Sequence, residues 1–200
     1  MRRSGVLMPV SSIPSRYGIG TFSRQAYDFI NLLEQAGQTY WQILPLGPTG
    51  YGDSPYQSFS TFAGNPYYID LEALIEKGWL TGEECDQYDF GDNEEYIDYE
   101  KIYLSRFKAL RTAYENSRIK EQEDFQRFCR ENAYWLDDYA LYMAVKNSFG
   151  GKSWSEWDDD IRLRRPEAMK RYREKFADEI GFYQFQQYLF RIQWEKLKGY

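Results

Sequence analysis

The segment that most constrains the fold of this chain is the apolar run at residues 40–46, which reads Tyr-Trp-Gln-Ile-Leu-Pro-Leu. Apolar and polar residues hardly alternate in it, a pattern typical of a strand that is covered on both faces. A second short apolar run precedes it at residues 5–10. Because strands covered on both faces are the kind found in parallel sheets, the sequence predicts that these two runs pair in parallel.

The residues between the two runs predict a helix that crosses from one strand to the other. A loop rich in Pro, Gly and Ser occupies residues 11–20, and Ser23 is placed to cap the helix that follows. Gly37 stands where a C-terminal stop is expected. Apolar residues recur along the helix at the spacing of a single face: Ala26, Phe29, Ile30 and Leu33. The natural outcome is a right-handed crossover over residues 1–46.

The loop after the second run carries the side chains of a sugar-binding surface. Residues 47–58 contain three glycines and two prolines, together with two tyrosines, one aspartate, two serines and one glutamine. Tyrosine offers a flat apolar face to a sugar ring, while Asp, Ser and Gln satisfy sugar hydroxyls as donors and acceptors. Loops at the C-terminal ends of strands are also where α/β barrels keep their chemistry. The alternative is an ordinary turn with tyrosines packed beneath it.

After residue 70 the pattern is helical almost to the end. Asp70 is placed to cap a short helix that stops at Gly78, and Thr81 with Glu84 has the spacing of a capping box. Three further sets of apolar residues at helical spacing predict three separate helices. The first set is Tyr103, Phe107, Leu110 and Tyr114, and the second is Phe125, Phe128 and Cys129. The third is Trp135, Leu136, Ala140, Met143 and Ala144. Pro166 is predicted in the first turn of a later helix that Gly181 interrupts.

Composition removes several classes of function. The chain has no histidine, and its two cysteines, Cys85 and Cys129, lie far apart without a CxxC spacing. We therefore expect no disulfide framework, no metal site and no Ser-His or Cys-His catalysis, which leaves acid/base chemistry to carboxylates. A net charge of -6 with dispersed basic residues argues against a nucleic-acid partner. The absence of a long apolar run argues against the membrane, so we expect a reduced, cytoplasmic setting.

Several of these segments together resemble the N-terminal signature of the 4-alpha-glucanotransferases, the amylomaltases or disproportionating enzymes of glycoside hydrolase family 77. The likeness is densest at residues 5–14, 17–20, 37–57 and 62–66, and it continues more weakly at 135–142, 150–151 and 188–194. It implies an α/β fold: the N-terminal part of a (β/α)8 TIM barrel with a large, mainly helical insertion, so that the content is mostly α-helical.

The resemblance also implies a division of the chain. Residues 1–70 would form the first strand-helix-strand unit of the barrel with a substrate loop at 47–66. Residues 71–181 would form the helical insertion subdomain, and residues 182–200 a helix leading back into the barrel. Since the chain stops in a helix where the next strand of an alternating fold would begin, we expect it to be the front portion of a longer protein.

The function that the resemblance implies is transfer of α-1,4-glucan segments between maltooligosaccharides by a retaining double displacement. The family needs no cofactor, and its catalytic carboxylates are expected beyond Tyr200, so the partners are glucans and the remainder of the polypeptide. Tyr56 matches the tyrosine that stacks on the donor-side sugar. The polar residues around that sugar match Asp53, Ser54 and Gln57, and an aromatic at a second glucan site matches Tyr51. Met8 stands where the family tends to have histidine, which argues against a polar role there.

Two other interpretations stay open on the residues alone. The aromatic content of 19% suits a non-catalytic glucan-binding module, and equally a helical interaction module with an aromatic core. Trp154 and Trp157 are three positions apart and form either a sugar platform or an anchor that holds the helical insertion onto its host barrel. We favour the anchor.

Overall fold

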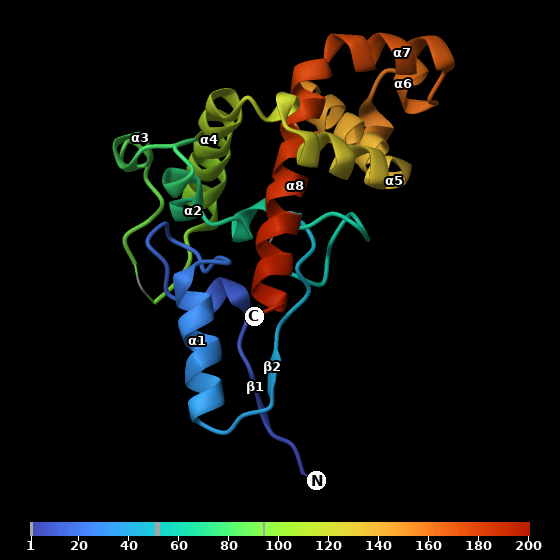
Figure 1. Ribbon diagram of the computed structural model, residues 1–200. Helices are drawn as coiled ribbons and strands as arrows, with labels where there is room; N and C mark the ends of the chain where they lie inside the picture. Colours follow the sequence, from blue (N-terminus) through green and yellow to red (C-terminus); the bar gives the residue numbers. More distant parts are fainter. Residues whose placement is uncertain (1, 51–52, 94) are drawn as a thin grey trace. The chain divides into compact units, whose positions relative to one another are not determined.

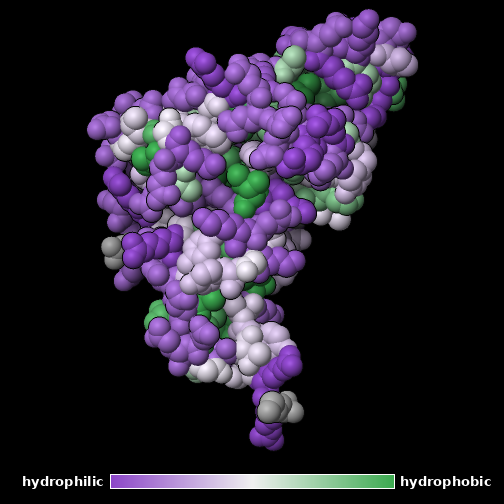
Figure 2. Space-filling model, viewed as in Figure 1, coloured by the Kyte–Doolittle hydropathy of each residue, from purple (hydrophilic) through white to green (hydrophobic). Residues whose placement is uncertain are grey.

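The computed structural model describes residues 2–50, 53–93 and 95–200. The chain divides into two compact units, one made of residues 1–118 and 189–200 and the other of residues 119–188. Helices make up most of both units, and the strands belong to the first (Figure 1). Polar side chains cover most of the face drawn in Figure 2, as the low mean hydropathy of -0.74 leads one to expect.

The predicted strand-helix-strand unit is present. Strands β1 (Gly5–Leu7) and β2 (Tyr40–Gln42) pair in parallel, with Val6 opposite Trp41, and helix α1 (Arg24–Gln35) joins them (Figure 1). A Cβ atom on Gly5 would lie 2.5 Å from the Tyr40 carbonyl oxygen, so close pairing requires glycine there.

The strands differ from the prediction in length and cover. The ladder of β2 ends at Gln42, and Leu7 and Tyr40 are about half exposed. Within the described residues no third strand flanks this pair. A strand buried on both faces needs neighbouring strands and a packed layer on each face. Here only the first three residues of the apolar run at 40–46 form a strand.

Aromatic side chains form the core of the first unit. Phe22 lies at its centre, with ring centroids 5.2 Å from Phe190 and 5.5 Å from Trp194. Both partners belong to helix α8 (Ala177–Lys198), whose last turns thus pack against the strand-helix-strand unit. The indole of Trp41 is fixed by a 2.8 Å hydrogen bond that it donates to the Met8 carbonyl. Residues from near the two ends of the sequence therefore build one core.

Local signals for helix ends are largely confirmed. Asp70 accepts hydrogen bonds from the amides of Glu72 and Ala73 at the start of α2 (Glu72–Glu76). Thr81 and Glu84 form the predicted capping box at α3 (Gly82–Asp86), with bonds of 3.1 and 2.8 Å. Positive φ angles at Gly37 and Gly78 end α1 and α2 as expected. Ser23 is the exception, since its hydroxyl makes no capping bond and is buried without a partner in the described structure.

The long helices differ more. In α4 (Tyr99–Ser117) the buried face centres on Arg106, Ala109 and Leu110, while Tyr103 of the predicted face is exposed. The two helices predicted within residues 125–144 are a single helix, α5 (Glu123–Ser148), and α8 continues through Gly181. The remaining helices are α6 (Asp159–Arg162) and α7 (Pro166–Lys175), the latter beginning at the predicted proline. Short 3-10 turns lie at Val10–Ser12, Pro66–Tyr68, Ile119–Glu121 and Trp154–Glu156.

Arg106 is a fully buried charge in the first unit. Its guanidinium donates to the carbonyl oxygens of Ile69 and Tyr17, which lie on two different loops. Burial lowers the pKa of Arg106 to about 10, and the nearby Asp70 carboxyl opposes this shift. The Arg106 side chain therefore connects α4 to the backbone of both of these loops.

The second unit has its own core. Leu141 and Val145 of α5 pack with Ile161 of α6 and with Met169 and Tyr172 of α7. None of the helices in the described part of the chain is long and apolar enough to cross a membrane.

Candidate functional site

The predicted substrate loop leaves β2 and returns at the 3-10 turn Pro66–Tyr68. Its base is closed by the Asn65 amide, which donates a 2.8 Å hydrogen bond to the Leu46 carbonyl. The Asn65 side chain in turn accepts from the Tyr67 amide at 3.0 Å and so starts the 3-10 turn. The two ends of the loop are therefore held together by polar groups of one residue.

Glycines allow the loop to pack closely above this base. A Cβ atom on Gly47 would lie 2.5 Å from the Ser58 hydroxyl oxygen, and one on Gly64 would collide with the Phe190 ring. The Ser58 hydroxyl donates to the Ser60 carbonyl at 2.9 Å, and the Ser60 hydroxyl accepts from the Ala63 amide at 3.1 Å. These bonds give the returning half of the loop a fixed course without regular secondary structure.

Asp53 is the half-buried acid of the loop. Its backbone φ of 54° is in the left-handed region, which Asp tolerates better than most residues. The Thr49 hydroxyl donates to its carboxyl at 3.3 Å. Burial raises the pKa of Asp53, with the Thr49 bond acting in the opposite direction. The pKa values of Tyr67 and Tyr99 are also raised. Burial is the larger cause for both, and the negative charge of Asp53 is the next.

The tip of the loop is open to solvent. Tyr56 is 73% exposed, and Gln57 beside it is also exposed. Ser54 is half-buried, and its carbonyl accepts a 3.1 Å hydrogen bond from the Gln57 amide, which turns the chain at the tyrosine. The tip therefore presents one flat aromatic face with a serine and a glutamine on either side of it.

Four of the predicted site residues lie in one short described segment, where they are neighbours along the chain: Asp53, Ser54, Tyr56 and Gln57. The fifth, Tyr51, lies outside the described residues. Sequence reasoning missed the setting of Asp53, which includes Thr49 and the two tyrosines on whose pKa its charge acts. The i, i+4 spacing of Thr49 and Asp53 was the sequence signal that could have predicted the Thr49 contact. No sequence signal predicts that Tyr67 and Tyr99 lie near Asp53, because only the folded chain brings them there.

Among the described residues, the His, Cys, Asp and Glu side chains form no group of three or more that is arranged to hold a metal ion. What the loop offers is a carboxyl in a partly desolvated position, an exposed aromatic face and neutral hydrogen-bonding groups. This set suits a neutral polyhydroxyl ligand better than a charged one. In α/β barrels, the loops at the carboxyl ends of the parallel strands are the ones that carry the active site.

Comparison with known proteins gives the particular family. The model of the 4-alpha-glucanotransferase family, glycoside hydrolase family 77, matches residues 8–200. The chain therefore belongs to the 4-alpha-glucanotransferase family. It is 50% identical over 193 residues to a 4-alpha-glucanotransferase of Clostridium butyricum, and 44% identical over 202 residues to one of Thermus thermophilus. These matches cover 96% and 99% of this chain but 40% and 39% of the relatives.

Solved structures agree with this assignment. An amylomaltase from Streptococcus agalactiae in complex with acarbose matches with a TM-score of 0.92 and 40% identity, over 100% of this chain and 41% of that one. An amylomaltase from Corynebacterium glutamicum, 20% identical, matches in fold with a TM-score of 0.71 over 98% of this chain and 28% of its own. The chain thus spans about 40% of the length of the curated relatives it matches.

Proposed function

We propose that this chain forms the donor-side sugar-binding wall of a 4-alpha-glucanotransferase that moves α-1,4-glucan segments between maltooligosaccharides. The observation that carries the proposal is the loop at 47–66, closed at its base by Asn65 and open at Tyr56. Family membership supports the reaction class. In this proposal residues 1–70 are the first strand-helix-strand unit of a (β/α)8 barrel, residues 71–181 a helical insertion, and residues 182–200 a helix leading back into the barrel.

The roles within the loop follow from side-chain chemistry. The Tyr56 ring stacks on the apolar CH face of a glucose unit, which orients the ring without a charge. Ser54 and Gln57 flank it and exchange hydrogen bonds with the rim hydroxyls. The Asp53 carboxylate, next to Ser54, accepts a hydrogen bond from a further sugar hydroxyl. Tyr51 is proposed to contribute an aromatic face at a second glucan site.

The chemical step is proposed to follow the retaining mechanism. One carboxylate attacks the anomeric carbon while a second carboxylic acid protonates the leaving oxygen, which produces a glycosyl ester and a shortened glucan. The hydroxyl of an acceptor sugar then attacks the same carbon, the second group removes its proton, and the ester bond breaks. We place these carboxylates outside the 200 residues, so the loop binds and orients the glucan while other residues break the bond.

The test is the substitution Tyr56→Ala in the full-length enzyme. We expect kcat/KM for maltotriose disproportionation to fall by about tenfold or more, the equivalent of about 1.4 kcal/mol, because the stacking face is removed. Tyr56→Phe keeps the ring and should retain most of the activity. Phe62→Ala removes another exposed ring of the same loop and serves as the matched control. An unchanged rate for Tyr56→Ala would rule out the proposed role.

A further inference from the structure

The helical unit at residues 119–188 contains a pocket of about 290 Å³. Its walls come from α5, α6, α7 and the turn Trp154–Glu156, and they include Leu141, Trp154 and Met169. On the face drawn in Figure 2, apolar surface is visible among polar side chains in the region that these helices occupy in Figure 1. The volume is at the lower end of the roughly 300–1,000 Å³ typical of small-molecule sites, so it suits a ligand of one ring.

The two tryptophans of this region have different environments. Trp157 is 8% exposed, with ring centroids 5.3 Å from Tyr142 and 5.8 Å from Phe149, and its indole donates to the Lys152 carbonyl. It belongs to the core of the helical unit and also lines the pocket. Trp154 is 56% exposed and lines the pocket. Its indole is therefore available as a platform.

A short turn holds Trp154 in place before any ligand arrives. The Glu156 amide donates to the Ser153 carbonyl at 2.9 Å, and the Trp157 amide donates to the Trp154 carbonyl at 3.3 Å. Since Trp157 is fixed in the core, its neighbour three positions earlier is positioned with it. An exposed aromatic ring on a fixed turn loses little conformational entropy on binding.

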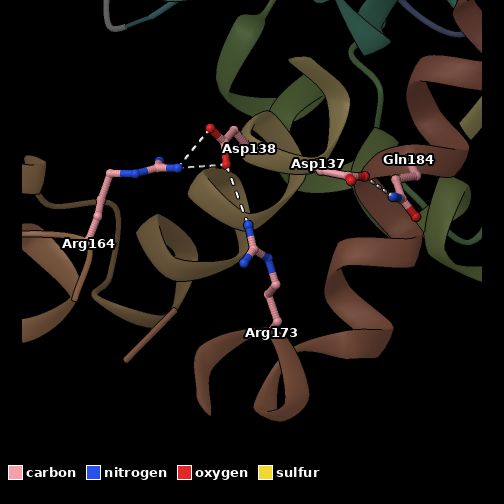
Figure 3. Close-up of polar contacts among 5 residues, drawn as sticks. All are labelled: Asp137, Asp138, Arg164, Arg173 and Gln184. Carbon is pink, nitrogen blue, oxygen red and sulfur yellow. Dashed lines mark hydrogen bonds and ion pairs between the residues drawn. The ribbon is translucent and has the colours of Figure 1, made fainter. Parts of the chain in front are cut away.

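Ion pairs neutralise the charged side chains of the pocket. Arg164 donates to both carboxylate oxygens of Asp138 at 2.9 Å, and Arg173 approaches the same carboxylate at 3.7 Å (Figure 3). Figure 3 also shows that Asp137 points the other way, toward Gln184. Arg164 has a φ of 53°, a left-handed conformation that is costly for Arg. An anionic ligand would have to compete with the carboxylate for these guanidinium groups, which favours a neutral ligand.

The pocket keeps hydrogen-bond acceptor capacity at Asp138. Its carboxylate oxygens can accept hydrogen bonds beyond those from Arg164. Arg162 also lines the pocket, and its guanidinium pairs through Nη2 with Asp159 at 2.6 Å.

We propose that this pocket binds one glucose unit of an α-1,4-glucan chain, an identification of the sugar that rests on the proposed function. Trp154 stacks on the apolar face of the ring. The Asp138 carboxylate accepts a hydrogen bond from a ring hydroxyl. The helical unit thereby holds a glucan segment independently of the loop at 47–66.

The experiment measures retardation of the full-length enzyme on native gels that contain amylopectin. All variants carry Tyr56→Ala, so that the loop does not contribute its stacking face. We expect Trp154→Ala to raise the apparent dissociation constant by at least about fivefold, as the loss of an aromatic platform implies. Trp154→Phe should be intermediate.

The matched control is Leu163→Ala, an exposed apolar residue next to Arg162 that does not line the pocket. Equal retardation of the Trp154→Ala and Leu163→Ala proteins would overturn the proposal, and so would loss of all retardation with Tyr56→Ala alone. If Trp154→Ala lowers the melting temperature, the Trp154→Phe result decides in its place. Full disproportionation by the Tyr56→Ala enzyme together with weakened binding by Trp154→Ala would reject the loop's role while supporting the pocket.

Discussion

At the scale of single residues, the first unit buries the charged side chains of Arg106 and Asp70. Asp70 is 9% exposed and caps α2, and the Gln193 side chain both accepts from its amide at 2.7 Å and donates to its carbonyl at 3.2 Å. Burial raises the pKa of the Asp70 carboxyl, and the hydrogen bond from the Glu72 amide opposes that shift. The Asp70 carboxylate thus makes the capping hydrogen bonds of α2, although its burial costs desolvation free energy.

This cost predicts a pH dependence. Because the pKa of Asp70 is raised above its ordinary 3.8, the folded state binds more protons than the unfolded state between the two values. The Asp70 contribution to the free energy of unfolding therefore falls as pH rises from about 4 through the folded-state pKa. The substitution Asp70→Asn keeps a capping oxygen and removes the titrating group.

The measurement is urea unfolding of the natural protein and of Asp70→Asn across pH 4 to 7. As the pH rises from 4 to 7, the free energy of unfolding of the natural protein should fall relative to that of Asp70→Asn. The contributions of the other acidic residues cancel in this difference, because both proteins contain them. Parallel stability curves would show that Asp70 has an unshifted pKa in the folded state.

At the scale of elements, local signals succeed where they act on neighbouring residues. The capping box of α3 pairs two residues three positions apart, and Pro166 fixes the first turn of α7. The predicted break within residues 125–144 was wrong because α5 contains neither Gly nor Pro. Gly181 does not stop α8, since Phe182 and Phe185 beside it are buried and their packing exceeds the roughly 1 kcal/mol cost of glycine in a helix.

The capping box gives a prediction for α3. Thr81→Ala should lower the free energy of unfolding by about 1 kcal/mol, because the Glu84 amide loses its acceptor. Thr81→Ser keeps the hydroxyl and should cost much less. Chemical denaturation provides the measurement, with Glu83→Ala, which changes another acid of the same turn, as the control. If Thr81→Ala and Glu83→Ala have equal effects, the capping bonds contribute no stability.

At the scale of the whole molecule, the chain divides into one unit that contains the strand pair and one that is helical. The first carries the loop at 47–66, and the second carries the pocket at Trp154. In our proposal both hold glucan, and neither supplies the carboxylates that break the bond. Binding and chemistry would then belong to different parts of the full-length enzyme.

This division predicts that the 200 residues alone transfer no glucose units. Purified chain should give no disproportionation products from maltotriose, because we place the carboxylate pair of the retaining mechanism outside it. The full-length enzyme, assayed in parallel, is the positive control. Transfer activity in the isolated chain would place catalytic carboxylates within residues 1–200 and would refute our interpretation of the loop as a binding wall only.

The sequence by itself determined the features that depend on patterns of residues close together in the chain. The parallel strand pair, the glycine that ends α1, the proline that starts α7 and the polar and aromatic groups of the loop were all readable from spacing. The family was readable too, because its motifs are continuous segments. At the helix ends the deciding hydrogen bond or backbone angle involves residues only a few positions apart.

Only the tertiary structure decided which side chains are buried. Nothing in the sequence separates Trp154 from Trp157, yet the first is 56% exposed and the second is 8% exposed and part of a core. Arg106 looks like a surface residue of α4 until Ile69 and Tyr17 are brought to it. The physical reason is that burial depends on contacts between segments tens of residues apart, and these exist only once the chain has folded.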